Sequence, residues 1–246
     1  EAEEAAQWML DLRPGNVPGL TRGAYLRELF GDLEGALDFL RSAYRRTPQR
    51  ELEDRAWILT HIAHLELLQG RLDAAEQTLQ EALKLFPDYH YPLAQLGKLR
   101  LEQGRAGEAV EVLRRRYRAA PHPENLLDVA EALEKAGDAR GAEEAFRDFE
   151  KKALAESEGT DNCNRDLALY LIDRAKRPAE APRLAEREAS RREDIFTLDA
   201  LAWALHANGR TAEARKMMER VIAVGTRDPR ILGHAAEILK GSAAKK

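Results

Sequence analysis

The sequence has little cysteine, few aromatic residues and no long apolar run. Its 246 residues include a single cysteine, Cys163, so a fold stapled by internal disulfides is excluded. Aromatic side chains make up only 6% of the residues. No stretch approaches the roughly 18–20 consecutive apolar residues that a membrane-spanning helix requires. The sequence therefore predicts a soluble chain without a membrane span, in the cytoplasm or the periplasm, and leaves the compartment open.

The chain also lacks a strong excess of charge of one sign. The 39 Lys and Arg residues against 43 Asp and Glu residues give a formal net charge of −4. A chain so close to neutral has no global attraction for nucleic acids or anionic membranes. Hydrophobic residues at 44% and charged residues at 33% are typical of a folded, helix-rich protein and not of a disordered one. We therefore expect no nucleic-acid partner.

One short pattern recurs: a glycine followed by a polar residue, with an alanine five positions after the glycine. The glycines are Gly31, Gly70, Gly104, Gly137 and Gly209. Their spacings are 39, 34, 33 and 72 residues, the last being close to two units. A proline follows 17 residues after each of the first three glycines, at Pro48, Pro87 and Pro121. Two markers in one phase indicate an internal repeat of about 34 residues.

Each marker has a physical role as the end of a helix. Glycine adopts the left-handed backbone conformation that ends one helix, and proline cannot continue the interior of the next. Between these stops, apolar residues recur three and four positions apart, as at Leu59, Ile62 and Ala63, which is the pattern of an amphipathic helix. Each unit is thus predicted to be two helices joined by a turn. Small residues lie seven positions before each glycine and let the helices cross closely: Ala24, Ala63, Gly97, Ala130 and Ala202.

These units resemble the tetratricopeptide repeat. The second unit matches the family pattern at Leu59, Ala63, Gly70, Ala75, Ala82 and Pro87, and the third at Leu93, Gly97, Gly104, Ala109 and Pro121. Leucine replaces the family's aromatic residue at the fourth place of the units, a change of packing detail. The resemblance covers essentially the whole chain. It implies an all-α fold: a right-handed superhelical α-solenoid of about 14 helices without strands.

The register of the pattern predicts a single solenoid over residues 1–246. It consists of a lone second helix or cap (1–16), repeats at about 17–50, 51–89, 90–122, 123–160, 161–194 and 195–227, and a terminal helix with a tail (228–246). The fifth repeat is degenerate, because Lys176, Arg177 and Pro178 replace its turn glycine, and its helical phase is not set by the pattern. The polar segment 157–162 before it is predicted to be a flexible joint. Both ends fall within a unit, which fits either a longer array or capping helices.

No motif predicts catalysis or a bound cofactor. His61 and His64 are three residues apart on one expected helix, but no third metal ligand accompanies them, so packed or solvated histidines are the simpler interpretation. Cys163 has no neighbouring base in the sequence. The basic run 114–118 spreads around its helix and forms no repeating polar code, which leaves an RNA-binding helical repeat as a distant alternative. We expect a protein that is not an enzyme and that needs no cofactor or metal.

The resemblance implies that the first helix of each unit lines a concave face. Carried over position by position, it nominates groove residues for a partner: Tyr25, Trp57, Thr60, His64, Tyr91, Lys98, Glu131, Asp199, Trp203 and His206. Trp and Tyr are enriched in binding hot spots, although Trp57 and Trp203 could instead fill gaps between units. The places where some family members clamp C-terminal carboxylates lack the required amides and cations, so chaperone tails are not expected.

The resulting prediction is a scaffold that binds a peptide or a helix of a partner protein. The alternative is a structural role, in which the terminal helices mediate self-assembly into dimers or filaments.

Overall fold

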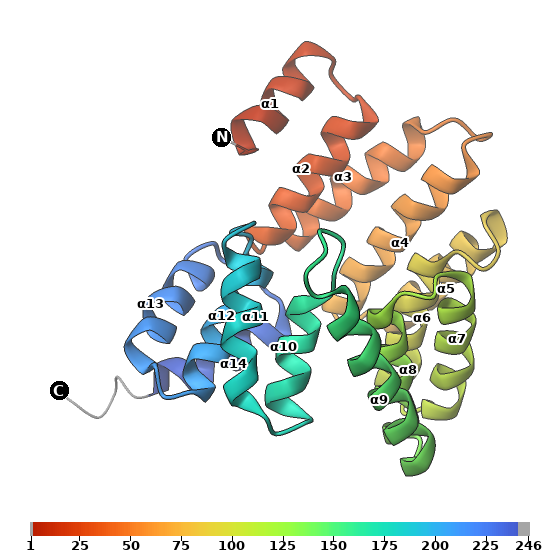
Figure 1. Ribbon diagram of the computed structural model, residues 1–246. Helices are drawn as coiled ribbons and strands as arrows, with labels where there is room; N and C mark the ends of the chain where they lie inside the picture. Colours follow the sequence, from red (N-terminus) through yellow and green to blue (C-terminus); the bar gives the residue numbers. More distant parts are fainter. Residues whose placement is uncertain (1, 241–246) are drawn as a thin grey trace. The chain divides into compact units, whose positions relative to one another are not determined.

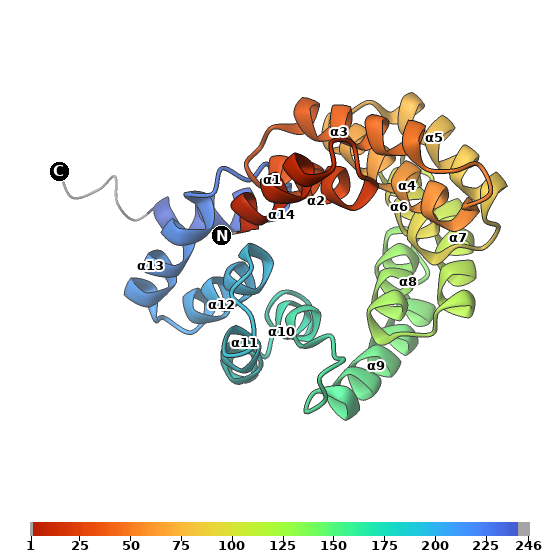
Figure 2. The same ribbon diagram turned by 90° about the horizontal axis from the view of Figure 1, so that it is seen from above.

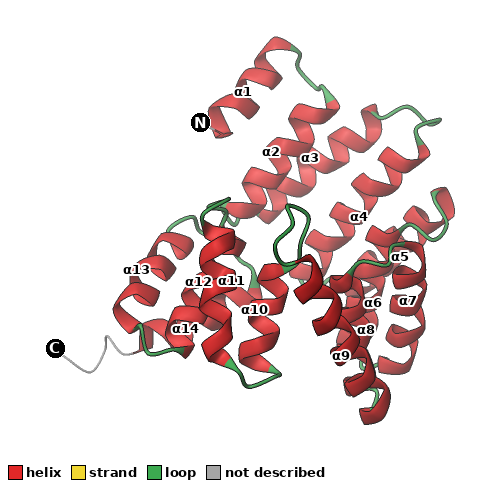
Figure 3. Cartoon of the chain, viewed as in Figure 1, coloured by secondary structure: helices red, strands yellow, loops and turns green. Residues whose placement is uncertain are grey.

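A computed structural model describes residues 2–240 of the chain (Figure 1). These residues form fourteen α-helices and one short 3-10 helix, and the described part contains no β-strand (Figure 3). The all-α helical repeat fold is therefore confirmed. The chain divides into two compact units, Glu1–Arg147 and Asp148–Lys246. A single solenoid over residues 1–246 stays a prediction, and the tail predicted at 241–246 lies outside the described residues.

The first unit is a row of helices that pack as successive pairs. It begins with α1 (Ala2–Leu12), and the pairs are α2 (Val17–Leu29) with α3 (Leu33–Arg46), α4 (Leu52–Leu68) with α5 (Leu72–Leu85), and α6 (His90–Glu102) with α7 (Ala106–Ala119). They are followed by α8 (Pro123–Lys135) and α9 (Ala139–Glu156), within which the boundary of the unit falls. Figure 2 shows that this row is curved, with α2, α4, α6 and α8 on its inner side and α3, α5 and α7 on its outer side.

The second unit contains shorter elements. Its helices are α10 (Asn164–Asp173), the 3-10 turn η1 (Pro178–Glu180), α11 (Ala181–Ala189), α12 (Ile195–Ala207), α13 (Thr211–Ile222) and α14 (Pro229–Leu239). The second helix of the degenerate repeat, α11, has 9 residues, whereas α3, α5 and α7 have 14 each. Lys176 takes the left-handed conformation, with φ 57°, in the turn that lacks a glycine. The buried Leu167, Ala168 and Leu171 now fix the helical phase of α10.

The turn glycines have the predicted left-handed conformation. Gly31, Gly70, Gly104, Gly137 and Gly209 have φ values from 71° to 82°. The helices of each pair also approach closely, as the small residues predicted. A Cβ atom added at Gly97 would lie 2.5 Å from Cδ2 of Leu113 on the paired helix α7. Because a larger side chain would push α6 and α7 apart at this crossing, the small residue is a packing requirement.

Arginine–glutamate pairs connect consecutive repeats. Arg71, which follows the turn of α4 and α5, pairs with Glu34 of α3. Arg100 of α6 donates through Nη2 to Oε1 of Glu76 on α5 at 2.6 Å, and only 8% of Arg100 is exposed. The hydrogen bond from the Arg100 guanidinium lowers the pKa of Glu76 from 4.5 to about 2. This buried pair therefore joins the second and third repeats electrostatically as well as by packing.

Hydrogen bonds fix the segment 157–162, which contradicts the predicted flexible joint. Nδ2 of Asn164 and Nη1 of Arg187 donate to the carbonyl oxygen of Ser157, at 2.9 and 3.1 Å. Nη1 of Arg191 donates to the carbonyl oxygen of Gly159 at 2.7 Å. The polar composition alone could not show that arginines on α11, and just beyond its end, reach the carbonyl groups of this loop.

The left-handed turn of the third repeat can be tested at Gly104. An added Cβ would meet no heavy atom within 4 Å there, so a substitution meets only the strain of φ 71°. We expect Gly104→Val to lower the free energy of unfolding by more than about 1 kcal/mol, because a β-branched residue resists positive φ. The matched variant is Gly107→Val in α7, where the space is equally open and φ is not positive. Helix propensity predicts no loss there. Equal losses in urea denaturation would contradict the explanation.

The buried pair predicts a pH-dependent loss of stability. We expect Glu76→Gln to cost about 2 kcal/mol, because it removes the charged acceptor of the hydrogen bond from Arg100 and leaves Glu108, 3.4 Å from Nε of Arg100, as the remaining counter-charge. Since the pKa of Glu76 is lowered in the folded state to about 2, the contribution of the pair is complete above pH 4.5 and is lost as pH falls towards 2.

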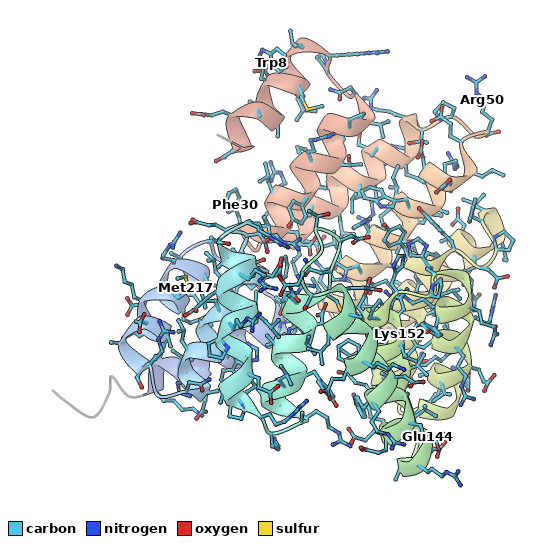
Figure 4. The ribbon with its side chains drawn as sticks, viewed as in Figure 1. Trp8, Phe30, Arg50, Glu144, Lys152 and Met217 are labelled. Atoms are coloured by element: carbon cyan, nitrogen blue, oxygen red, sulfur yellow. The ribbon has the colours of Figure 1, made fainter. Side chains whose placement is uncertain are left out.

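The control for this experiment is Glu144→Gln. Glu144 lies on α9 (Figure 4) and pairs with Arg140 at 3.1 Å, with side chains 56% and 91% exposed. Such an exposed pair contributes at most about 0.5 kcal/mol. Urea denaturation of both variants between pH 7 and pH 3 measures the difference. A pH dependence of Glu76→Gln equal to that of the unsubstituted chain would refute the assignment.

Candidate partner-binding site

Several side chains on the first helices of unit Glu1–Arg147 are exposed along one helical face. On α6, Tyr91 and Lys98 are exposed and Gln95 between them is partly buried, while Leu93, Leu96 and Gly97 are buried. We call the following set the first-helix row: Tyr25, Glu28, Trp57, His64, Tyr91, Lys98 and Glu131. Tyr25 on α2 is 48% exposed and Tyr91 on α6 is 46% exposed. Two tyrosine rings held half in water on rigid helices form a surface that a partner could cover.

The middle of the row is a histidine–aromatic cluster on α4. The ring of Trp57 is 4.0 Å from that of His61, at an interplanar angle of 49°. Burial, with a smaller contribution from His64, lowers the pKa of His61 from 6.5 to about 4. His61 is therefore neutral at pH 7. Nε2 of His64 lies 2.9 Å from Oε1 of Glu28, which links α4 to α2. The cluster thus combines an apolar ring with a polar bridge between two first helices.

A second aromatic cluster holds Tyr91 at the start of α6. Its ring lies 4.0 Å from His90 and 5.3 Å from Tyr89, the latter at 90°. Tyr89 is 7% exposed, and burial raises its pKa to about 12. The preceding residue, Asp88, has a left-handed φ of 58° and accepts a hydrogen bond from Nη2 of Arg115 at 2.7 Å. These contacts fix the orientation of Tyr91 before any partner binds, which reduces the entropy cost of binding.

Two of the nominated residues do not present their side chains to solvent. Thr60 is 4% exposed, and its hydroxyl donates to the carbonyl oxygen of Ala56 at 2.7 Å. Asp199 is 2% exposed, and its carboxylate lies 2.9 Å from Nδ1 of His234 on α14. Both side chains are therefore engaged within their own unit and are left out of the first-helix row.

The aromatic residue nominated on α12 is packed into the second unit. Nε1 of Trp203 donates to Oδ1 of Asp173 at 2.9 Å. The indole stacks on His234 with ring centroids 4.3 Å apart and an interplanar angle of 9°, and on His206 at 5.5 Å. Trp203 and His206 thus belong to the packing of α10, α12 and α14. This matches the alternative in which Trp203 fills a gap between repeats.

Sequence reasoning did not place His61 or His90 among the partner-facing residues. Both lie 4.0 Å from an aromatic ring of the row. The available signal was spacing, since His61 follows Trp57 by one helical turn and His90 adjoins Tyr91.

The described residues contain neither a metal centre nor a candidate membrane span. No three His, Cys, Asp or Glu side chains within residues 2–240 come together in a way that could hold a metal ion. None of the helices in the same range combines the length and apolar character needed to cross a bilayer. Cys163 is 5% exposed.

Comparison with known families accounts for the repeats. Two models described as tetratricopeptide repeat match the chain, one over residues 66–126 and the other over residues 197–231. The chain contains tetratricopeptide repeats. Such repeats imply a protein-interaction scaffold in general, and their fold is typically that of a non-enzymatic protein. A search of curated protein sequences found no match.

Solved structures support this fold at low sequence identity. A structure of the human IFIT1 dimer with PPP-AAAA aligns with a TM-score of 0.54 and 17% identity, over 89% of this tetratricopeptide repeat chain and 57% of that one. MamA aligns with a TM-score of 0.51 and 18% identity, over 63% and 88% of the two chains. The APC/C hetero-tetramer Cut9–Hcn1 aligns at 0.52 and 13% identity, over 98% of this chain and 39% of its own. The chain therefore spans about half the length of two of these proteins, and the likeness concerns the fold alone.

The lowered pKa of His61, beside Trp57 of the row, predicts a pH dependence of stability. Because the pKa of His61 falls from 6.5 to about 4 on folding, the unfolded chain binds a proton between these pH values that the folded chain does not. Stability therefore decreases as pH falls from 6.5 towards 4, by about 2 kcal/mol between pH 7 and pH 5 from this residue.

The variant His61→Phe keeps a ring against Trp57 but does not titrate. Between pH 7 and pH 5, its free energy of unfolding should fall by about 2 kcal/mol less than that of the unsubstituted chain. Urea denaturation at the two pH values measures the difference. An unaltered pH dependence of His61→Phe would contradict the prediction.

Proposed function

We propose that the protein is a non-catalytic scaffold that binds a peptide or helical segment of a partner protein on the first-helix row of unit Glu1–Arg147. The observation that carries this proposal is the pair of half-exposed tyrosines, Tyr25 and Tyr91, which are 48% and 46% exposed on helices of the same unit, with the ring of Tyr91 held by its neighbours. Exposed aromatic rings on a rigid frame are the usual anchors of protein interfaces. No cofactor or metal enters the proposal.

The charges of the row support a protein partner over a nucleic acid. Lys98 is a basic member of the row, whereas Glu28 and Glu131 are acidic. Nucleic-acid binding depends on several cations that neutralise phosphates, and this face has an excess of carboxylates. A peptide with apolar side chains and charges of both signs fits it better. The PPP-AAAA in the human IFIT1 structure provides a natural comparison ligand.

A second candidate function, self-assembly, is favoured by one observation on α1. Trp8 is 63% exposed (Figure 4). Leu12, one turn further along the same helix, is 65% exposed. Burying this face against another copy would remove apolar surface from water. The first-helix row does not include these residues, so the two candidates predict different sensitive positions.

The test uses a peptide selected from a phage-displayed library of 16-residue segments against the intact protein. Tyr25→Ala and Tyr91→Ala should each weaken its binding at least about tenfold, the effect of losing about 1.4 kcal/mol at an anchor. The matched control is Phe30→Ala, since Phe30 is also 48% exposed but lies outside the row. Trp57→Ala is less suitable, because Trp57 packs against the core.

Three further measurements separate the candidates. Circular dichroism confirms that each variant is folded, sedimentation measures mass against concentration, and a 5′-triphosphate oligoadenylate is titrated in place of the peptide. Equal effects of Phe30→Ala and the tyrosine variants would overturn the row as the binding site. A mass that rises with concentration and falls with Trp8→Ala would favour self-assembly. Oligonucleotide binding that Tyr91→Ala weakens would overturn the protein partner.

A further inference from the structure

The second unit contains a cavity that the first-helix row does not use. It has a volume of about 320 Å³ and lies between α11 and α13, with Leu201 and Leu205 of α12 at its base. Met217 of α13 forms one wall (Figure 4). Ligand pockets in proteins range from about 300 to 1,000 Å³. The cavity is therefore large enough for one or two apolar side chains.

Comparison of the repeats shows why a cavity occurs here. Leu205 lies four residues before its turn glycine, at the place that Glu66 holds in α4 and Arg100 in α6. In α8 this place also holds a leucine, Leu133, but the second helix of that repeat, α9, is 18 residues long. Oε2 of Glu66 accepts a hydrogen bond from Thr78 of α5 at 2.9 Å, and Arg100 pairs with Glu76. Those polar side chains bridge neighbouring helices, whereas a leucine cannot make such a bridge.

The neighbouring helix adds to the effect. The wall contributed by α11 is built on a helix of 9 residues, against 14 in α3, α5 and α7. The base of the cavity is consequently apolar, and the helix beside it is shorter than its counterparts in the first three repeats.

The charges around the cavity are unevenly compensated. Arg210 is bound by two carboxylates, Glu186 at 2.6 Å and Glu213 at 2.7 Å. Lys216, in contrast, is exposed and has no ion pair among residues 2–240. Arg220, one turn further along α13, pairs with Glu193 at 2.9 Å, but these side chains are 50% and 67% exposed. An exposed pair of this kind contributes little to stability, and its arginine can pair with another anion instead.

From these observations we infer that the cavity between α11 and α13 is a second protein-docking site, which takes an apolar side chain of a partner segment that is flanked by acidic residues. The apolar side chain contacts Leu201, Leu205 and Met217. A neighbouring carboxylate pairs with Lys216 and draws Arg220 from Glu193. The site is independent of the first-helix row, because all residues that line it belong to unit Asp148–Lys246, whereas the row belongs to unit Glu1–Arg147.

The experiment uses methyl-13C-methionine NMR of the intact chain. The probes are two synthetic hexapeptides with the same apolar residues, the acidic Asp-Glu-Phe-Asp-Leu-Glu and the basic Lys-Lys-Phe-Lys-Leu-Lys. The sequence contains three methionines, and Met217→Leu assigns the signal of the cavity wall. The acidic peptide should shift the Met217 signal and leave that of Met9, in the other unit, unchanged. The basic peptide should shift neither.

A charge reversal tests the electrostatic part. Lys216→Glu should weaken binding of the acidic peptide at least tenfold, as measured by the same titration. The matched control is Lys152→Glu, at an exposed lysine on α9 outside the cavity (Figure 4), which should bind like the unsubstituted chain. Tyr91→Ala should also leave this binding unchanged, so that failure here is distinguishable from failure of the first-helix row.

Three outcomes would overturn the inference. The first is an unshifted Met217 signal at millimolar acidic peptide. The second is an equal response to the acidic and basic peptides. The third is a shift with octanoate but not with peptide, which would make the cavity a site for small amphiphiles.

Discussion

The close crossing of two helices within each repeat is the constraint on which the rest of the structure depends. At Gly97 the crossing leaves no room for a Cβ beside Leu113, and the chain must then reverse within a few residues to bring α7 back along α6. Glycine supplies both requirements, as a small residue at the crossing and as a left-handed residue at the turn. Once the two helices of a pair are fixed, their remaining apolar faces can be buried only against the next pair. The row of helices results because each pair buries its remaining apolar face against the next pair.

The constraint leaves one face of each first helix without a packing partner from its own pair, and the two units use that face differently. In the first unit Tyr25 and Tyr91 remain about half exposed, and Tyr91 is oriented by neighbouring rings. In the second unit Trp203, which occupies the same place as Tyr25 relative to its turn glycine, is held by a hydrogen bond to Asp173 and by stacking on His234. The same position of the repeat therefore provides surface in one place and packing in the other. For this reason the proposed partner site is restricted to the first unit.

The sequence predicted the fold well because the features that determine it are local. The turn glycines and the small residues at the crossings can be recognised from spacing alone, since each acts within one repeat. The residues of the partner-binding site were harder to predict, because the exposure of a side chain depends on the neighbouring helix. Helical phase nominated Tyr25, Tyr91 and Lys98, which are exposed, but it also nominated Thr60 and Asp199, which are buried. For Asp199 the reason is His234, 35 residues away on α14, and no pattern within one repeat contains that contact. Lys176 shows the same limit, because its left-handed turn replaces a glycine that the pattern required.

Differences between the repeats show where a repeat protein has features that its repeat architecture does not require. At the place four residues before the turn glycine, Glu66 bridges to Thr78 and Arg100 to Glu76, whereas Leu133 and Leu205 cannot make such a bridge. Replacing such a bridge by Leu205 while shortening the facing helix removes two sources of stability at one place. Apolar surface at the base of a cavity also forgoes the dispersion contacts that a filled core would provide. A partner's side chain in the cavity would bury the apolar surface and restore the dispersion contacts. A longer side chain of this protein itself could have done the same without a partner. The sequence has leucine and methionine there, and lysine and arginine beside them, which is the arrangement expected of a site that is completed from outside.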